Sequence, residues 1–398
     1  MLKNAPMSPP LPSIDSFAAA KLAEIRARGL YRTIRPTVRH ADGTVTREGR
    51  RLISFSCNDY LNLAHHPEVK ARARAAIDTY GAGAGASRLI TGNHPLLDAL
   101  ESRLAALKGA EAAAVFGSGY LANLGIIPSF AGPGDLILMD EYCHACLFAG
   151  ARISGAEVMT FRHNDMDHLA ALLAEHRQSF RHALILTDGV FSMDGDLAPL
   201  DEMAPLARRF EAWLMTDDAH GVGVLGRDGR GSSFMGPDKA DVPLQMGTLS
   251  KAIGSYGGYL CASRTVIDYV KNRARSLIFT TGLPPASVAA SIAALDVIAN
   301  DPALRGEPLR KARLFADALG LPQPQSPIVP VIVGTPDAAL QAAAALEERG
   351  FLVVAIRPPT VPEGTARLRV TFTAAHQDQD VLRLAEAVRA LGLPRPAP

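Results

Sequence analysis

Short apolar runs alternate with helix-like segments through the middle of the chain, and this alternation restricts the fold more than any other feature. The apolar runs lie at 112–116, 136–139, 157–161, 183–187, 213–216, 244–248 and 258–262. Segments with helical periodicity separate several of them, at 95–108, 120–130, 145–154, 166–178 and 201–211. This order predicts a mostly parallel α/β sheet covered by helices on both faces. Ligands of such sheets bind at the carboxyl ends of the strands.

The flanking segments predict further elements and three regions. Before the alternating part we expect a helix at 15–29, a hairpin at 37–55 that turns at 41–43, and a helix at 67–80. After it we expect one long helical segment at 284–319, strands at 328–333, 351–356 and 367–372, and helices at 336–349 and 378–391. The predicted regions are an N-terminal segment with a disordered, proline-rich lead-in (1–55), a large domain (56–290) and a smaller C-terminal α+β domain (291–398).

Charge and hydropathy argue against several classes of protein. The formal net charge is +1 over 398 residues, and no block of lysine and arginine occurs. This balance gives no electrostatic reason to expect a nucleic-acid or membrane-surface partner. No apolar run reaches the roughly 20 residues needed to span a bilayer. The first residues, MLKNAPMSPPLPS, lack the apolar core of a secretory signal, so we expect a cytoplasmic protein.

Two motifs match binding signatures without their usual context. Gly221 to Gly226 fits the G-x-G-x-x-G pattern of dinucleotide sites, but the chain continues as a loop where a helix should begin. Cys143 and Cys146 have C-x-x-C spacing, but no second pair follows. The spacing would suit half a zinc site or a redox pair, but the other two cysteines lie far away in the sequence, so we expect no metal and ordinary reduced thiols.

The strongest chemical signal lies between Trp213 and Gly258. An apolar run ends in Asp217, and His220 follows in a glycine-rich turn. A second apolar run leads to Lys251, which hydroxyl and small residues surround rather than charges. A desolvated lysine is a good amine nucleophile, and an enzyme that uses pyridoxal phosphate (PLP) needs such a lysine, a carboxylate for the ring nitrogen and hydroxyls for the phosphate. Taken alone, Lys251 also fits a surface lysine, Asp217 fits a helix cap or surface turn, and His220 fits an ordinary turn histidine.

Several longer motifs resemble one family. They are FSCNDYLNL (55–63), ASRLITGNH (86–94), DGVFSMDGDLAPL (188–200), DDAHGVGVLGRDGRG (217–231) and TLSKAIGSYGGY (248–259). Together they resemble the α-oxoamine synthases of the fold type I PLP enzymes over residues 15–391, nearly the whole chain. The resemblance implies a PLP-dependent acyltransferase that is a homodimer with its active site at the interface. Asp188, where the family commonly has Glu, and Ser250, where Gly is common, depart from the pattern.

The resemblance also implies roles for individual residues. Lys251 would bind PLP as a Schiff base and move the Cα proton, Asp217 would pair with the ring nitrogen, His220 would contact the phenolic oxygen, and His144 would stack on the ring. Contacts with the phosphate or ring are implied for Ser118, Gly119, Tyr120, Ser192, Thr248 and Ser250, and for Thr280 or Thr281 of the neighbouring subunit. Contacts with substrate are implied for Arg32, Asn58, His144, Arg357, Thr360 and Arg369, with Arg369 binding the amino-acid carboxylate.

One segment narrows the expected substrates. AIRPPTVPEGTARLRVTFTAAH (355–376) resembles the members that condense L-alanine with a pimeloyl thioester in biotin biosynthesis. The carrier of the acyl group, coenzyme A or acyl carrier protein, stays open. A sister enzyme that uses glycine or serine with another acyl-CoA is the alternative within the family. A non-catalytic partner subunit is the alternative outside the enzymes, although such subunits typically lack the lysine that is present here.

Overall fold

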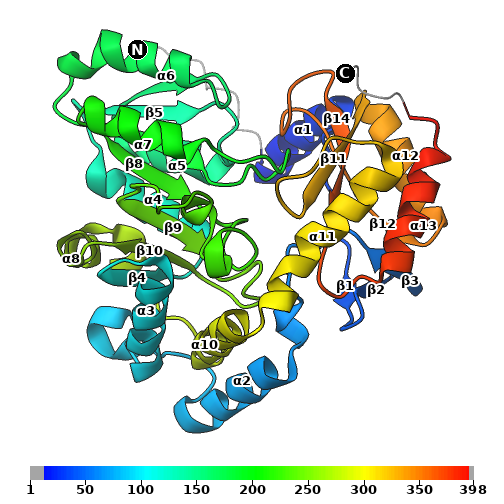
Figure 1. Ribbon diagram of the computed structural model, residues 1–398, viewed down its shortest axis with the longest axis horizontal. Coiled ribbons are helices and arrows are strands. Elements are labelled where there is room, and N and C mark those ends of the chain that lie inside the picture. The colour runs from blue at the N-terminus through cyan, green and yellow to red at the C-terminus, as the bar shows by residue number, and fades with distance from the viewer. Residues whose placement is uncertain (1–12, 394–398) are drawn as a thin grey trace, which may run out of the picture.

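The computed structural model describes residues 13–393 and contains two sheet-bearing parts. Figure 1 shows the larger part, in cyan and green, beside a smaller part that joins the blue N-terminal strands to the orange and red C-terminal elements. The expected disordered lead-in lies outside the described residues, except for Ser13 and Ile14. The domain boundaries at 55/56 and 290/291 stay predictions.

The larger part is built on a seven-stranded sheet in the order β4-β10-β9-β8-β7-β5-β6. Its strands are β4 (Ala112–Phe116), β5 (Leu136–Asp140), β6 (Glu157–Phe161), β7 (Ala183–Asp188), β8 (Trp213–Asp217), β9 (Leu244–Thr248) and β10 (Gly258–Ala262). Only β10 runs antiparallel to its neighbours, β4 and β9. The mostly parallel sheet predicted from the apolar runs is therefore confirmed. Four of the strands (β5, β7, β9 and β10) are buried along their whole length, as continuous apolar runs require.

Helices pack on both faces of this sheet. On one face, a core formed with α4 (Gly119–Phe130), α5 (Ala145–Ser154), α8 (Arg264–Arg273) and α9 (Arg275–Ile278) covers the sheet. On the other face lie α6 (Met166–His176) and α7 (Leu200–Arg209), and near β4 and β10 lie α2 (Pro67–Tyr80), α3 (Pro95–Lys108) and α10 (Pro285–Asn300). The helices α8 and α9 have no counterpart in the sequence prediction. Both faces are thus closed to solvent, which leaves the strand ends as the place for a site.

The smaller part contains two further sheets. The first has the order β1-β2-β3-β12, with β1 (Thr37–Arg39), β2 (Thr44–Arg47), β3 (Arg50–Ser54) and β12 (Phe351–Leu352). The second has the order β11-β14-β13, with β11 (Ile328–Gly334), β13 (Val354–Ile356) and β14 (Ala366–Thr371). The helices α12 (Pro336–Glu348) and α13 (Asp378–Arg389) complete a core with the strands. The N-terminal helix α1 (Ile14–Ala27) has no buried residue.

Three sequence predictions in these parts were wrong in detail. The 37–55 hairpin is a three-stranded meander, because a second turn occurs at Glu48 and Gly49, both with positive φ. The single strand at 351–356 is two strands, of which β12 pairs with β3 and β13 pairs with β14. The helix at 284–319 breaks between α10 and α11 (Pro302–Leu319), where Asp301 caps α11 and Pro302 cannot continue α10.

The same two helices bear on the membrane question. Among the described residues, no single helix is long and apolar enough to cross a membrane, and α10 and α11 meet the length and composition criteria only as a pair bent by 84°.

The glycine-rich motif that mimics a dinucleotide site wraps around a buried ion pair instead. Lys108 and Asp218 are fully buried and their Nζ and Oδ2 atoms lie 2.8 Å apart. The Asp218 carboxylate also accepts the backbone N–H of Ser232. A Cβ on Gly221 would lie 2.2 Å from Asp218 Oδ1, and one on Gly231 would lie 1.7 Å from Oδ2. Glycine is required here because the loop backbone packs against a carboxylate, not against a phosphate.

Candidate active site

A cavity of about 210 Å³ opens at the carboxyl ends of the central strands. It brings together ten of the predicted site residues: Ser118, Gly119, Tyr120, His144, Ser192, Asp217, His220, Thr248, Ser250 and Lys251. Cys146, Asp188, Val190, Ala219 and Met246 complete its wall. These residues lie at the ends of five strands, β4, β5, β7, β8 and β9, or in the segments that follow them, so the cavity depends on the order of the strands in the sheet.

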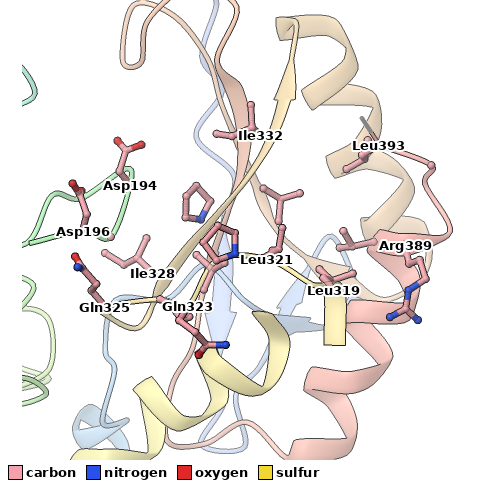
Figure 2. A pocket seen from close by; sticks show the side chains of 18 residues that line it. Asp194, Asp196, Leu319, Leu321, Gln323, Gln325, Ile328, Ile332, Arg389 and Leu393 are labelled. Carbon is pink, nitrogen blue, oxygen red and sulfur yellow. The ribbon is translucent and has the colours of Figure 1, made fainter. Parts of the chain in front are cut away.

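A larger cavity of about 670 Å³ lies elsewhere, between the 194–196 turn and the C-terminal elements (Figure 2). Its wall is formed mostly by Leu, Ile, Val and Pro side chains of residues 319–332 and 388–393. None of its lining residues is a lysine, histidine, serine, threonine or cysteine. It therefore lacks the amine and hydroxyl groups of the predicted chemistry, and the smaller cavity is the candidate active site.

Lys251 ends a chain of hydrogen bonds that starts at a buried tyrosine. Tyr60 Oη lies 2.6 Å from His220 Nδ1, and His220 Nε2 lies 2.7 Å from Lys251 Nζ. Burial raises the pKa of Tyr60 to about 12, so its hydroxyl is protonated. Burial also lowers the pKa of His220 well below its ordinary value, so the ring is neutral. The neutral ring places no second positive charge beside the amine of Lys251.

The amine itself is also shifted toward its neutral form. Burial lowers the pKa of Lys251 from 10.5 to about 8, and the charge of Asp217 only partly opposes this effect. At pH 7 about a tenth of a lysine with such a pKa is the nucleophilic neutral amine, far more than for a lysine with the ordinary value.

Asp217, the last residue of β8, is held as a hydrogen-bond acceptor. Its Oδ2 accepts from Asn123 Nδ2 at 2.8 Å, and its Oδ1 accepts from the backbone N–H of Ala219 at 3.0 Å. Asp188 ends the neighbouring strand β7, and burial together with the charge of Asp217 raises its pKa well above the ordinary value. We infer that Asp188 is the protonated member of this pair and that Asp217 carries the charge.

The N-terminus of α4 and two hydroxyl residues form the anion-binding side of the cavity. Ser118 caps α4 by accepting the N–H of Leu121, and this leaves its hydroxyl proton free for another partner. First-turn N–H groups and the helix dipole favour an anion at such a position. The Thr248 hydroxyl donates to Gly257 O, and its oxygen lies 2.8 Å from Ser250 Oγ. A phosphate that accepts a hydrogen bond from either hydroxyl would therefore compete with these contacts.

His144 is the N-cap residue of α5. Its Nδ1 accepts the backbone N–H of Cys146 and lies 2.8 Å from the Cys146 thiol. Burial lowers the pKa of His144, although the charge of Asp217 opposes this, so the ring is neutral. Stacking of this ring on PLP stays a prediction. Burial raises the pKa of Cys146 to about 12, which makes it a protonated lining residue and not a nucleophile.

Arg369 and Asn58 meet beside the cavity although 311 positions separate them. Asn58 Oδ1 accepts from Arg369 Nη1 at 3.2 Å and from Nη2 at 3.3 Å, and Ser192 O accepts from Nε at 2.5 Å. The remaining guanidinium protons suit a carboxylate, for which arginine is the preferred partner. The β14 strand places this side chain against the ends of the large sheet.

Besides Asn58 and Arg369, which lie beside the cavity, five further predicted residues do not line it. Arg357 donates to Gly29 O, and both Arg32 and Thr360 are exposed. Thr280 donates to Ser276 O, and Thr281 pairs with Ser87 in an isolated bridge. Their predicted contacts with an acyl donor or with a neighbouring subunit stay predictions. Three residues that contact the site residues were not predicted from the sequence to lie at this site: Tyr60, Asn123 and Cys146. For Tyr60 the signal was its place in the 55–63 motif, and for Asn123 its position one helical turn after Gly119.

The comparisons with known proteins agree with this geometry. A family model described as aminotransferase class I and II matches residues 50–388. The chain belongs to this family. Its relatives include 8-amino-7-oxononanoate synthases from Methylocella silvestris, 66% identical over 87% of this chain and 98% of that protein, and from Beijerinckia indica, 60% identical over 95% and 98%.

Two solved structures extend the comparison. Serine palmitoyltransferase from S. paucimobilis, with bound PLP-myriocin aldimine, has a TM-score of 0.89 at 28% identity and covers 96% of this chain and 98% of the other. An 8-amino-7-oxononanoate synthase from Francisella tularensis has a TM-score of 0.73 at 27% identity, with coverage of 85% and 97%. The predicted α-oxoamine synthase family, fold type I class, acyltransferase class and PLP cofactor are confirmed.

The residues present fit this cofactor. The cavity offers an amine with a lowered pKa at Lys251, a carboxylate at Asp217, and an anion site at the N-terminus of α4. When bound, PLP supplies an aldehyde that reacts with amines and a ring that withdraws electrons from the attached substrate carbon.

The lowered pKa of Lys251 leads us to expect that cofactor uptake depends on pH. Only the neutral amine attacks an aldehyde, and the pKa of Lys251 is about 8. We therefore expect the initial rate at which apoprotein takes up PLP to rise with pH and to reach half its maximum near that pKa. Absorbance followed from about pH 6 to pH 11 would measure it, and a midpoint near 10.4, the ordinary lysine value, would contradict a desolvated Lys251.

Proposed function

We propose that the protein condenses L-alanine with a pimeloyl thioester to give 8-amino-7-oxononanoate, CO₂ and the free thiol. The observation that carries this proposal is the identity of 66% to a protein of that name, together with the Lys251, Asp217 and Arg369 geometry. The acyl carrier is coenzyme A or acyl carrier protein, and both fit the same reaction.

Each side chain then has a defined task. Arg369 and Asn58 hold the α-carboxylate of L-alanine. Lys251 Nζ, poised by His220, removes the proton from the α-carbon as a general base and later returns it. Asp217 stabilises positive charge on the ring nitrogen, which allows electrons to leave the α-carbon during proton removal and loss of CO₂. The buried wall around them keeps water from the reacting carbon.

A sister reaction with serine is the main alternative, because the serine palmitoyltransferase structure has the higher TM-score. A TM-score reports the course of the backbone, which sister enzymes share. Identity reports the side chains that select substrates, and it is 66% toward the oxononanoate synthase against 28% toward the palmitoyltransferase. We therefore favour alanine. A non-catalytic subunit is disfavoured because Lys251 and Asp217 are both present in the cavity.

The product of the holoenzyme tests the proposed reaction. We expect 8-amino-7-oxononanoate, detected by mass spectrometry, from L-alanine with pimeloyl-CoA or pimeloyl-acyl carrier protein. With glycine or L-serine, we expect kcat/KM to be lower by about tenfold or more, the size of discrimination that one small group in a pocket provides. A preference for serine with a long-chain acyl-CoA would assign the protein to the sister reaction.

The proposal includes a cytoplasmic homodimer. Leu89, Ile90 and Phe279 are 63%, 74% and 69% exposed, and Ser87 pairs with Thr281 between their segments. A second copy would cover these apolar side chains, which a monomer leaves in water. The free thiols, for example Cys143, suit a reducing compartment. Sedimentation that gives the mass of one chain at assay concentrations would contradict the dimer.

A further inference from the structure

A tight turn connects the cavity wall to the C-terminal sheet. Phe191 N–H donates to Asp196 O at 3.0 Å, and Gly195 N–H donates to Phe191 O at 2.8 Å, so residues 192–195 form its tip. At the tip, Ser192 O accepts from Arg369 Nε and Asp194 pairs with Arg367. The tip therefore sets where the Arg369 guanidinium lies, and the question is what holds the base of the turn.

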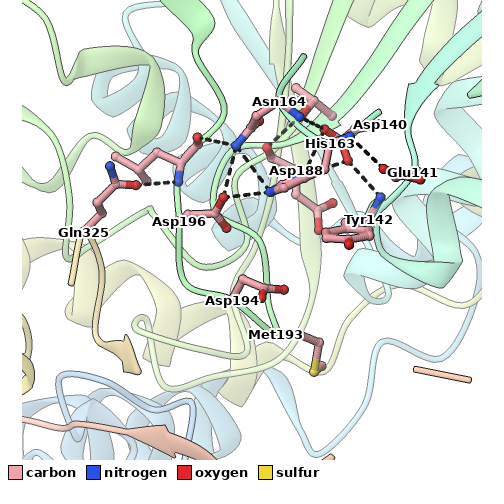
Figure 3. Close-up of polar contacts among 12 residues, drawn as sticks. Asp140, Glu141, Tyr142, His163, Asn164, Asp188, Met193, Asp194, Asp196 and Gln325 are labelled. Carbon is pink, nitrogen blue, oxygen red and sulfur yellow. Dashed lines mark hydrogen bonds and ion pairs between the residues drawn. The ribbon is translucent and has the colours of Figure 1, made fainter. Parts of the chain in front are cut away.

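His163 holds that base from the large sheet (Figure 3). Its Nδ1 lies 3.0 Å from Asp140 Oδ1, at the end of β5, and its Nε2 lies 2.7 Å from Asp196 Oδ2. The ring is also edge-on to Phe191, with the centroids 4.4 Å apart, and stacks on Tyr142 at 4.5 Å. His163 thus contacts both residues that close the turn.

Only a doubly protonated ring can make these contacts. Both ring nitrogens face carboxylate oxygens, and both are donors only in the imidazolium. Burial lowers the pKa of His163, but the hydrogen bonds to Asp140 and Asp196 outweigh this and raise it to about 10. Glu141 adds a third carboxylate nearby, which accepts the backbone N–H of His163. The ring therefore stays charged at neutral pH, and its contact with Asp196 is a charge-assisted hydrogen bond.

Asn164 and Gln325 also contact the turn and the residue that follows it. Asn164 Nδ2 donates to Asp196 Oδ2 at 3.1 Å and to Leu197 O, and Gln325 accepts the N–H of Leu197 (Figure 3). These bonds from uncharged amides hold the exit from the turn. Asn164 also reaches the central sheet, because its backbone N–H donates to Asp140 Oδ2 at 2.8 Å. His163 differs from Asn164 in that it bridges Asp140, at the end of β5, and Asp196 with a charged ring.

We propose that His163 is a positioning residue, which fixes the 191–196 turn through Asp196 and thereby holds Arg369 where it binds the substrate carboxylate. The proposal rests on the proposed function only in that Arg369 binds an amino-acid carboxylate. It assigns His163 no contact with substrate or cofactor.

The test separates positioning from a general loss of folded enzyme. In His163→Gln we expect the Kd for the amino acid to rise about tenfold, a typical size for indirect coupling, with kcat at saturation nearly unchanged. Kd is measured on the holoenzyme from the absorbance change of the cofactor, without any acyl donor. A role confined to stability would instead reduce the fraction of active protein and leave Kd unchanged, and this result would overturn the proposal.

A second variant and a control guard against misfolding. Asp196→Asn keeps the shape of the turn and should raise Kd by a similar factor, and the double variant should raise it no further than either single one. Additive effects would overturn the proposal. His176→Gln, on the surface of α6, should leave Kd at the wild-type value.

The same measurement is independent of the proposed reaction. Arg369 would bind the α-carboxylate that L-alanine, glycine and L-serine share, so Kd is measured for whichever of them the wild-type protein binds. A wild-type protein that binds an amino acid but makes no 8-amino-7-oxononanoate would refute the proposed function alone.

Discussion

Replacing Lys251 by alanine should reduce kcat by about 10⁴-fold, the upper end of what a positioned general base contributes. The variant loses the group that attacks the cofactor aldehyde and the group that moves the α-proton. It also leaves Nε2 of His220 without the partner that lies 2.7 Å away in the native protein. Steady-state rates with L-alanine and a pimeloyl thioester would measure the loss. Hydride reduction followed by mass spectrometry should find PLP attached to the wild-type protein and not to the variant.

A matched lysine controls for the substitution itself. Lys239 is exposed and donates to the backbone of Gly109, outside the cavity, so Lys239→Ala should retain wild-type turnover. Added methylamine should restore part of the activity of Lys251→Ala, because a small amine can replace the missing base in an otherwise intact site. Turnover of Lys251→Ala near the wild-type rate would refute the assignment.

Replacing Asp217 by asparagine should reduce kcat by about 10³-fold, comparable with the loss of one preorganised electrostatic partner at a developing charge. Asn123 Nδ2 and the N–H of Ala219 hold the carboxylate in place, so the isosteric amide should keep the fold while it loses the charge. Steady-state kinetics on the holoenzyme, with PLP content measured by absorbance, would separate a slower reaction from weaker cofactor binding. A kcat close to wild type would mean that Asp217 has no electronic role.

The neighbouring aspartate is the control for this variant. Asp218 is equally buried, but it pairs with Lys108 and holds the 227–232 loop. Asp218→Asn leaves Lys108 as an uncompensated buried charge, so it should lower the free energy of unfolding by about 3 kcal/mol. The folded fraction should keep its kcat. Two adjacent aspartates at the end of one strand are thus expected to differ in kind, one acting on the reaction and the other on stability.

Local periodicity explains why so much of the large sheet was predictable. Each buried strand, such as β9, is a short apolar run, and each helix, such as α3, repeats every few residues within one segment. Pairing between distant segments leaves no such local record. The pairing of β3 with β12 joins residues almost 300 positions apart, and nothing near either strand announces it. The division of 351–356 between two sheets was missed for the same reason.

The same difference between local patterns and long-range contacts separates the site residues that were predicted from those that were not. Lys251, Asp217 and His220 stand out in the sequence because each follows an apolar run, and strand ends of a parallel sheet meet at one edge. No comparable rule predicts which residues from distant segments will meet. Three such contacts are Tyr60 with His220, Asn58 with Arg369, and His163 with Asp196.

The sequence by itself therefore determined the chemistry of this protein: its family, its cofactor, and the lysine and aspartate that use it. Only the tertiary structure decided how far burial lowers the pKa of the lysine and how Arg369 is anchored beside the cavity. The physical reason is that a pKa and a hydrogen bond depend on distances of a few ångströms and on burial. Those distances are set by how sheets, turns and helices pack together, whereas strand and helix patterns are set within one segment.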